Sequence, residues 1–252
     1  EEIRLTGGEP FLRREFPDIV TRLAALPLKK IGITTNGILL DRYCDLLKSL
    51  NILDLNISLD SLNPTTFNTI THGDYLAKII ANIQLATQAG FRVKTNTVIM
   101  KGINDHEIED FIRFAQKHNV TVRFLEVMRI GYACHQQSHW FIPAQTLINR
   151  LRQRHTLTPV STPLDATAFE FVTETGVQLG FIASESQPFC GHCSRWRLAA
   201  DGMLRACLLK ETGLSLKGRS PLERQSIYQQ LLGMKPYLRP PEVSHAMHQI
   251  GG

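Results

Sequence analysis

The sequence predicts an α/β protein in which parallel strands form an open or partial barrel, followed by a small C-terminal region. In residues 1–154, short apolar runs alternate with amphipathic stretches, as in repeated strand–helix units. Each apolar run ends in polar or glycine-rich residues. From residue 155 the pattern changes to short strands and turns, which divides the chain into a core of 1–154 and a C-terminal region of 155–252.

Five strands, each followed by helical periodicity, are expected in the core. Strand–helix–strand connections pair successive strands in parallel with right-handed crossovers. Five strands are too few to close a barrel of the eight-stranded kind. The strands are expected at 3–5, 29–35, 53–59, 92–99 and 120–127, and the helices near 15–26, 41–50, 64–70, 75–89, 105–118 and 143–154.

The C-terminal region carries four short strand patterns and one helix. An Asp201-Gly202 turn would fold the last two of these strands into a hairpin. The strands are FEFVT (169–173), QLGFI (178–182), RWRLA (195–199) and MLRAC (203–207), and the helix lies near 221–233.

Polar residues follow each strand of the core. In parallel sheets the chemistry sits beyond the carboxyl ends of the strands, so these residues are expected to share one site. A Gly-Gly turn after a strand also lets the backbone approach a ligand closely. The strand ends carry GGEP (7–10), TTNG (34–37), SLDS (58–61), Asn96-Thr97 and Glu126-Val127-Met128.

Composition is ordinary for a globular protein, with 43% hydrophobic and 20% charged residues. No apolar run approaches the roughly 18 residues of a membrane span. The formal net charge of +5 suits an anionic small ligand and nucleic acid equally well. The five cysteines lack the spacing of a disulfide framework, which favours a reducing compartment and metal-binding thiols.

Three cysteines, Cys190, Cys193 and Cys207, lie in one short segment. The hairpin would bring Cys207 beside the CxxC pair, so that three sulfurs converge. A zinc site needs a fourth ligand, for which His192 is nearest although it lies within the CxxC turn. A [4Fe–4S] cluster accepts three thiolates if one iron is left for a substrate atom. Spacing alone leaves both alternatives, and unligated thiols, open.

Arginines accompany these thiols. Arg195 and Arg197 share one face of a strand, so two guanidinium groups could meet one phosphate. A solvated face with alternating arginines is an equally simple interpretation. The other cysteines indicate no site: Cys44 fits a small buried hydrophobe, and Cys134, with His135 and His139, is interpreted as part of a loop without a metal role.

Taken in order, these motifs resemble the GTP 3′,8-cyclase family (molybdenum cofactor biosynthesis protein A) of the radical S-adenosylmethionine superfamily. The resemblance covers nearly the whole chain and rests on IRLTGGEPFLR, GITTNG, LNISLDSL, VKTNTVIMKGIND, FLEVM, FCGHC-x13-C and the terminal Gly-Gly. It implies a (β/α)6 radical-SAM partial barrel. It also implies radical conversion of GTP to (8S)-3′,8-cyclo-7,8-dihydroguanosine 5′-triphosphate, the first step of molybdenum cofactor biosynthesis.

The resemblance further implies a role for each matching residue. S-adenosylmethionine would contact Gly8, Ser58 and Met128, with Glu9 near its amino group. The three clustered thiolates would hold a second [4Fe–4S] cluster whose open iron meets the guanine, and two arginines would be catalytic: Cys190, Cys193 and Cys207, with Arg195 and Arg197. GTP would be bound by Arg4, Thr35, Lys94, Arg195, Trp196 and Arg197.

One part of the family pattern is absent. The family begins with a strand and a CxxxCxxC loop that holds the first [4Fe–4S] cluster, whereas the CxxC of this chain is that of Cys190 and Cys193. We therefore expect a truncated chain that lacks the first barrel strand and cannot generate a radical alone. The resemblance also implies an electron donor, a downstream cyclic pyranopterin synthase, a cytoplasmic location and a homodimer, without membrane or nucleic acid.

Two rival interpretations remain open at this point. One is another radical S-adenosylmethionine enzyme with an auxiliary cluster, such as a peptide modifier. The other is a zinc-stapled nucleic-acid-binding module, which the basic charge and the Cys/Arg segment suggest but in which the strand-end motifs have no role. In the favoured interpretation, the side-chain-free Gly251-Gly252 end could enter the strand-end site.

Overall fold

The structure of the protein, a computed structural model, describes residues 1–243. Its core is a curved sheet with the strand order β1-β2-β3-β4-β5-β8-β7-β6. The α/β class predicted from the sequence is thus confirmed. The strands are β1 (Glu2–Leu5), β2 (Lys30–Thr35), β3 (Asp54–Ser58), β4 (Arg92–Ile99), β5 (Thr121–Glu126), β6 (Leu157–Val160), β7 (Phe169–Thr173) and β8 (Gln178–Ile182).

Two strands that the sequence assigned to the C-terminal region, at 169–173 and 178–182, belong to the main sheet. β8 pairs in parallel with β5, with Phe124 opposite Phe181, so β1 to β5 and β8 form a run of parallel strands. β7 and β6 then extend the sheet in antiparallel pairing. The centre of β8, from Leu179 to Phe181, is buried. An apolar run buried on both faces suits an interior strand, and this is why QLGFI joins the core.

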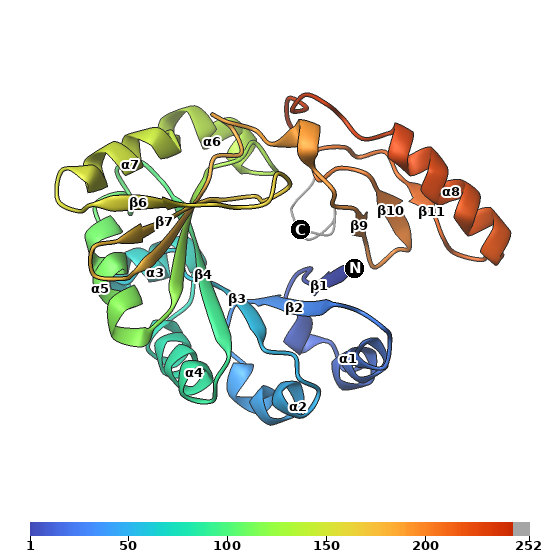
Figure 1. Cartoon of the computed structure of the whole chain (residues 1–252), viewed down its shortest axis with the longest axis horizontal. Helices are drawn as coiled ribbons and strands as arrows, with labels where there is room; N and C mark the ends of the chain where they lie inside the picture. The colour runs from blue at the N-terminus through green and yellow to red at the C-terminus, as the bar shows by residue number, and fades with distance from the viewer. Residues whose placement is uncertain (244–252) are drawn as a thin grey trace.

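Helices cover the convex face of the sheet, as Figure 1 shows. Alternate strand residues such as Ile33, Leu55 and Phe124 are buried beneath them. Cys44 is buried as expected from its amphipathic helix. The helices are α1 (Phe16–Ala24), α2 (Cys44–Ser49), α3 (Pro64–Thr71), α4 (Leu76–Gln88), α5 (Ile108–His118), α6 (Ala133–Trp140), α7 (Ala144–Arg152) and α8 (Pro221–Gly233), with short 3-10 turns η1 (Pro10–Leu12), η2 (Leu40–Arg42) and η3 (Cys190–His192).

The helix α6 corrects the interpretation of its segment as a loop. None of its residues is buried, so the apolar periodicity by which a helix is recognised in sequence is missing. Cys134 instead donates from Sγ to the Val243 carbonyl at 3.3 Å. This contact ties the start of the helix to the last described residue.

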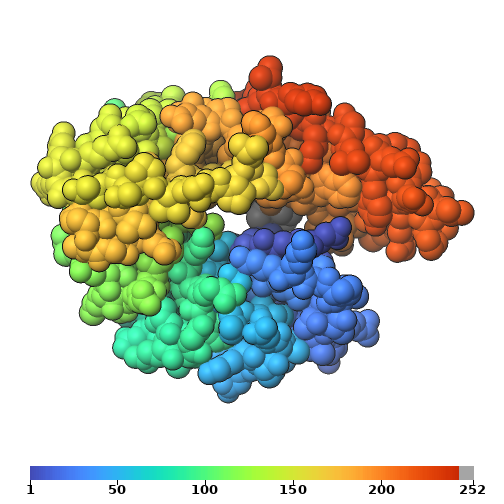
Figure 2. All heavy atoms as spheres, viewed as in Figure 1, coloured from blue at the N-terminus to red at the C-terminus, as the bar shows by residue number. Residues whose placement is uncertain are grey.

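The C-terminal residues form a small three-stranded sheet, ordered β11-β10-β9, of β9 (Arg197–Leu198), β10 (Met203–Arg205) and β11 (Leu214–Ser215). Gly202 takes a φ of +81° in the turn, which confirms the predicted hairpin. Leu204 and Leu231 pack this sheet against α8. In Figure 1 the small sheet lies across the open side of the main sheet, facing β1, and Figure 2 shows a hollow between the two.

Within residues 1–243, no helix has the length and apolar character needed to cross a bilayer. The predicted role of Gly251-Gly252 concerns residues outside the described part of the chain.

Candidate functional site

Glu9 connects the first two strand ends. Its carboxylate accepts hydrogen bonds from the Phe11 amide (3.1 Å), the Thr35 hydroxyl (2.7 Å) and the Asn36 amide (2.6 Å). Gly7 turns the chain into this loop with a φ of +128°, a conformation suited to glycine. The GGEP and TTNG motifs therefore form one hydrogen-bonded unit.

Thr35, expected to contact GTP, is only 2% exposed. Its hydroxyl donates to Glu9 and accepts from the Gly37 amide at 3.0 Å. This arrangement favours a role for Thr35 in orienting Glu9 over a direct contact with GTP.

The other residues expected at S-adenosylmethionine lie at neighbouring strand ends. Gly8 and Ser58 are exposed, and Ser58 lies opposite Asn96 in the pairing of β3 with β4. Met128 follows β5 and packs against Ile130 and the Cys207 segment. Met128 thus lies where the main sheet meets the cysteine-bearing hairpin.

Two buried carboxylates hold this junction together: Glu126, which the sequence placed at a strand end, and Glu185, which it did not single out. Glu126 accepts from the amides of Ala144 (2.8 Å), Glu185 (2.8 Å) and Ser186 (2.9 Å). Glu185 forms a buried ion pair with the Arg239 guanidinium group. This pair attaches the segment that follows α8 to the end of the main sheet. In sequence, Glu185 resembles an ordinary surface glutamate, because its partner Arg239 lies far along the chain.

Cations gather on the sheet face away from the helices. Arg4, Lys94 and Arg123 line a cavity of about 50 Å³ with Asn56, and the cavity also borders the ion-paired Lys30, Asp54 and Arg92. Lys94 pairs with Glu170 at 3.4 Å. The cavity therefore has the charge that an anionic ligand requires.

Arg123 is the residue of this group that the sequence did not single out. Its Nε donates to Asn96 Oδ1 at 2.9 Å. Burial, and next the charge of Arg4, lower the pKa of Arg123 to about 10, although Glu170 opposes the shift. A Cβ at Gly180 would approach Arg123 Cγ to 2.9 Å, so this glycine makes room for the arginine. An alternating strand position and a glycine on a neighbouring strand are the only sequence signal.

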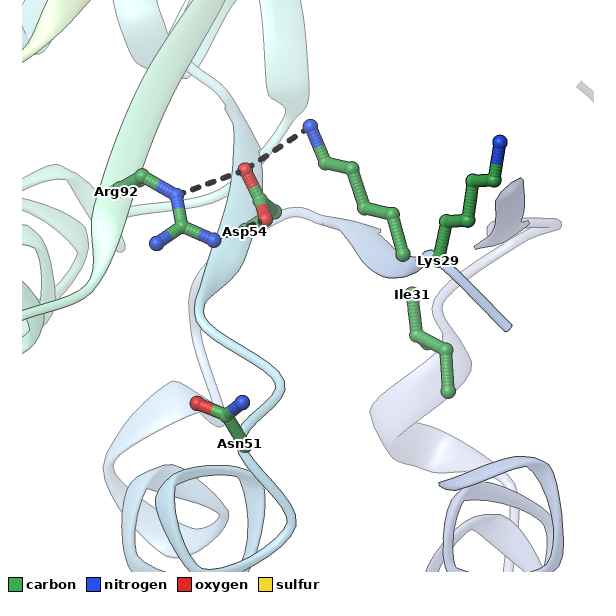
Figure 3. Close-up of a pocket in the computed structure, with 6 residues that line it drawn as sticks. Lys29, Ile31, Asn51, Asp54 and Arg92 are labelled. Atoms are coloured by element: carbon green, nitrogen blue, oxygen red, sulfur yellow. Dashed lines mark hydrogen bonds and ion pairs between the residues drawn. The ribbon is translucent and has the colours of Figure 1, made fainter. Parts of the chain in front are cut away.

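A larger cavity of about 250 Å³ lies at the amino ends of the strands. Figure 3 shows Asp54 between Arg92 and the neighbouring lysine, and Asp54 bonds to Arg92 at 2.6 Å and to Lys30 at 3.1 Å. This cavity is at the opposite end of the sheet from the strand-end motifs. Because its carboxylate already pairs with two cations, we base no site on it.

The three clustered cysteines lie within electrostatic range of each other. Burial, then the charges of Cys207 and Cys193, raise the pKa of the Cys190 thiol. The pKa of Cys193 is lowered: burial, the largest influence, opposes this, but Arg195 and Lys235 outweigh it. Arg195 Nη2 lies 3.6 Å from the Cys193 sulfur, and its guanidinium group stacks on Phe189 at 4.6 Å from the ring centre.

Arg197 and Trp196, which follow Arg195, lie on opposite faces of the hairpin strand. Burial and the charge of Arg195 lower the pKa of Arg197, and the charges of Cys193 and Cys207 oppose this shift. Trp196 points the other way and stacks on Tyr228 of α8, with ring centres 5.8 Å apart. That position favours a packing role for Trp196 over a contact with GTP.

In residues 1–243, no group of three or more His, Cys, Asp or Glu side chains has the arrangement of a metal-ion site. His192, the candidate fourth zinc ligand, is exposed. The ligands of a zinc ion must converge on one centre, whereas each thiolate of a [4Fe–4S] cluster binds a different iron. Three thiols with Arg195 and Lys235 beside Cys193 are the residues here that could hold a metal centre.

The curved parallel sheet with polar strand ends defines a fold of the radical S-adenosylmethionine class. Residues 1–115 match the model of the Radical SAM superfamily, and residues 120–235 match Molybdenum Cofactor Synthesis C. A solved structure of Streptococcus suis SuiB bound to precursor peptide SuiA has the same fold, with a TM-score of 0.68 at 12% identity, covering 93% of this chain and 56% of that one.

Curated relatives then identify the family. The GTP 3′,8-cyclase of Synechocystis sp. is 61% identical over all of this chain and 77% of its own length. That of Aquifex aeolicus is 36% identical over 86% of this chain and 68% of its own length. The GTP 3′,8-cyclase of Acaryochloris marina is 41% identical over 99% of this chain and 82% of its own length. This chain belongs to the GTP 3′,8-cyclase family.

Proposed function

We propose that this chain acts in the conversion of GTP to its 3′,8-cyclised product, with GTP held between the main sheet and the cysteine-bearing hairpin. The observation that carries the proposal is that cations gather both in a cavity of the main sheet and on the cysteine-bearing hairpin. Arg4, Lys94 and Arg123 line the sheet cavity, and Arg195 and Arg197 lie on the hairpin.

The sheet cations suit the triphosphate. Guanidinium groups form bidentate hydrogen bonds to phosphate, and a partly buried pair of arginines gains by neutralisation. Burial first, and next the charge of Arg4, lower the pKa of Arg123. Arg4 pairs with Glu2 at 2.8 Å, which offsets part of the repulsion between the two guanidinium groups. A bound polyphosphate would remove this repulsion, so binding energy is concentrated at this end of the nucleotide.

The hairpin suits the guanine base and a second [4Fe–4S] cluster. Cys190, Cys193 and Cys207 supply three thiolates, which leaves one iron available to the base. Arg195 and Arg197 would balance the charge of the cluster and approach the substrate, as catalytic residues. The chain thereby fixes the base and the phosphates at two separate points, which orients the ribose between them.

The strand ends suit S-adenosylmethionine. Gly8 and Ser58 are exposed there, Met128 closes the side toward the hairpin, and Glu9 offers a fixed carboxylate to an amino group. S-adenosylmethionine, with the cluster that reduces it, supplies the one-electron chemistry of the reaction. We also propose an electron donor, a downstream cyclic pyranopterin synthase as recipient of the product, and a homodimer.

Anaerobic reconstitution with iron and sulfide tests this function. The protein is expected to bind about four irons per hairpin, and GTP should change the cluster's electron paramagnetic resonance spectrum and bind in calorimetry. Replacing Cys190, Cys193 and Cys207 with serine should abolish both signals, whereas Cys134→Ser, which alters a half-buried thiol elsewhere, should preserve them. Stoichiometric zinc without iron, or tight RNA binding without GTP binding, would refute the proposal.

A further inference from the structure

Lys235 reaches from the end of α8 into the cysteine-bearing hairpin. Its Nζ donates to the Arg195 carbonyl at 2.6 Å and to the Ala206 carbonyl at 3.1 Å. The same Nζ lies 3.8 Å from the Cys193 sulfur. One ammonium group thus contacts three points of the segment that carries the clustered thiols.

The two carbonyl groups belong to opposite strands of the hairpin. Arg195 follows Cys193 by two residues, and Ala206 directly precedes Cys207. The β9–β10 pairs are Leu198 with Leu204 and Arg197 with Arg205. Lys235 therefore connects the two strands just beyond their last backbone pair, at the level where the thiols must be spaced.

The position of Lys235 is fixed by the packing of α8. Leu231 is fully buried, and Ile227 and Met234 pack beside it against the hairpin core. Because a lysine stem is flexible, anchoring of the helix that directly precedes Lys235 is what makes a three-point contact reproducible.

The ammonium group of Lys235 also places a positive charge beside the Cys193 sulfur, where it can affect the reduction potential of a bound cluster. Thiolate-ligated iron–sulfur clusters are tuned by nearby charge and by hydrogen bonds to sulfur. Reduction adds negative charge, so a cation next to a ligand sulfur stabilises the reduced form. Arg195 offers a second cation to the same sulfur, but it also faces the proposed substrate, whereas Lys235 contacts hairpin atoms.

We propose that Lys235 is a positioning residue for the second cluster: it sets the spacing between the Cys193 and Cys207 strands and favours the reduced cluster. This inference rests on the proposed function, because it presupposes that the three thiols hold a cluster.

The test uses anaerobically reconstituted full chain with Lys235→Met and Lys235→Gln. The first removes the charge and all three contacts, and the second removes the charge but retains an amide donor. Lys235→Met is expected to retain less than half of the wild-type iron and sulfide after gel filtration. Lys235→Gln is expected to retain the cluster but to lower its reduction equilibrium constant about tenfold, or about 59 mV for a one-electron couple.

Lys210→Met is the matched control, because Lys210 lies in the same region but, among residues 1–243, its Nζ donates to the Met234 carbonyl at 3.3 Å and to no atom of the cysteine strands. It should match wild type in iron content and potential. If circular dichroism shows that Lys235→Met does not fold, the reduction potential of the cluster in Lys235→Gln tests the inference. A wild-type potential in Lys235→Gln overturns the inference while the proposed function stands. Absence of a cluster from the wild type itself would instead refute the proposed function.

Discussion

The Arg4 side chain lies directly over Gly32 of the neighbouring strand. A Cβ built at Gly32 would come within 2.8 Å of Arg4 Nη1 and 3.0 Å of Cζ. Arg4 is paired with Gly32 in the parallel register of β1 with β2. The absence of a side chain at Gly32 therefore lets the guanidinium group lie flat over the sheet, at the cavity that it shares with Lys94 and Arg123.

Gly32→Ala should weaken GTP binding with little loss of stability. The new methyl group would meet only the flexible end of Arg4, which can move away at small energetic cost, but the guanidinium group would leave its place beside the cavity. Loss of one charge-assisted contact, about 1.5 kcal/mol, corresponds to roughly tenfold weaker affinity. Calorimetric titration with GTP and thermal unfolding measure the two effects.

Gly233→Ala provides the control, because nothing lies within 4 Å of a Cβ at that position. GTP affinity should be unchanged in this variant. If Gly32→Ala also binds GTP with unchanged affinity, then Arg4 does not contribute to GTP binding.

Arg123→Met should also weaken GTP binding. The variant keeps an apolar stem over Gly180 but removes the partly buried charge that Arg4 now repels. We expect about tenfold to hundredfold lower affinity, the effect of roughly 1.5 to 3 kcal/mol for a hydrogen bond to a charged group. The stability of the free protein should change little, because relief of the burial and repulsion of the charge is opposed by loss of the hydrogen bond to Asn96.

Arg113→Met serves as the comparison for Arg123, since Arg113 is 69% exposed on α5 and pairs with Asp110. A loss of GTP affinity equal in both variants would show a general charge effect instead of a site at Arg123. Repeating the titrations at higher salt separates the two further, because buried contacts are screened less.

Sequence periodicity located nearly all of the sheet and its helices, because each apolar run was bounded by clear turn residues. The short strands β6 and β11 were not predicted, and β7 and β8 were assigned to the C-terminal region. The causes are physical for β8 and for α6. β8 is as short and apolar as a hairpin strand, and only its long-range pairing with β5 places it in the main sheet. In α6 no residue is buried, so there was no apolar face to detect.

The site was predictable to the extent that it consists of local motifs. The cysteine spacing and the hairpin turn lie within one segment, and the structure confirms the turn. The joint role of the three thiols stays a prediction. Arg123 and Lys235 were missed because their partners lie on other elements: Asn96 for the first, and Arg195 and Ala206 for the second. The spacing of residues in a single sequence does not show which residues from different elements will be in contact.

Glu9→Gln tests whether this residue acts through the fold or through the cofactor. The carboxylate accepts on both oxygens from three donors, and a glutamine would direct an NH₂ group at one of them. We expect a loss of about 1 to 3 kcal/mol in unfolding free energy, the cost of an unsatisfied buried donor. If only S-adenosylmethionine affinity falls and urea unfolding is unchanged, the hydrogen-bonded unit is not structurally important.

Asp60→Asn should stabilise the protein at neutral pH but not in acid. Burial raises the pKa of Asp60 to about 6, although the Val98 amide donates to its Oδ1 at 2.8 Å. A carboxyl whose folded pKa is raised favours the folded state below its unfolded pKa near 4, and this contribution is lost as pH rises through the folded value. At pH 8 the wild type therefore carries a cost of up to about 3 kcal/mol.

The asparagine keeps the acceptor for Val98 and never ionises, so the variant should be more stable than wild type at pH 8. The difference should fall by about half at pH 5 and nearly disappear at pH 4. Urea unfolding across this range measures it, with Asp110→Asn, at a residue whose side chain is 48% exposed, as the reference. A constant difference between Asp60→Asn and wild type from pH 4 to pH 8 would show that Asp60 titrates normally in the folded protein.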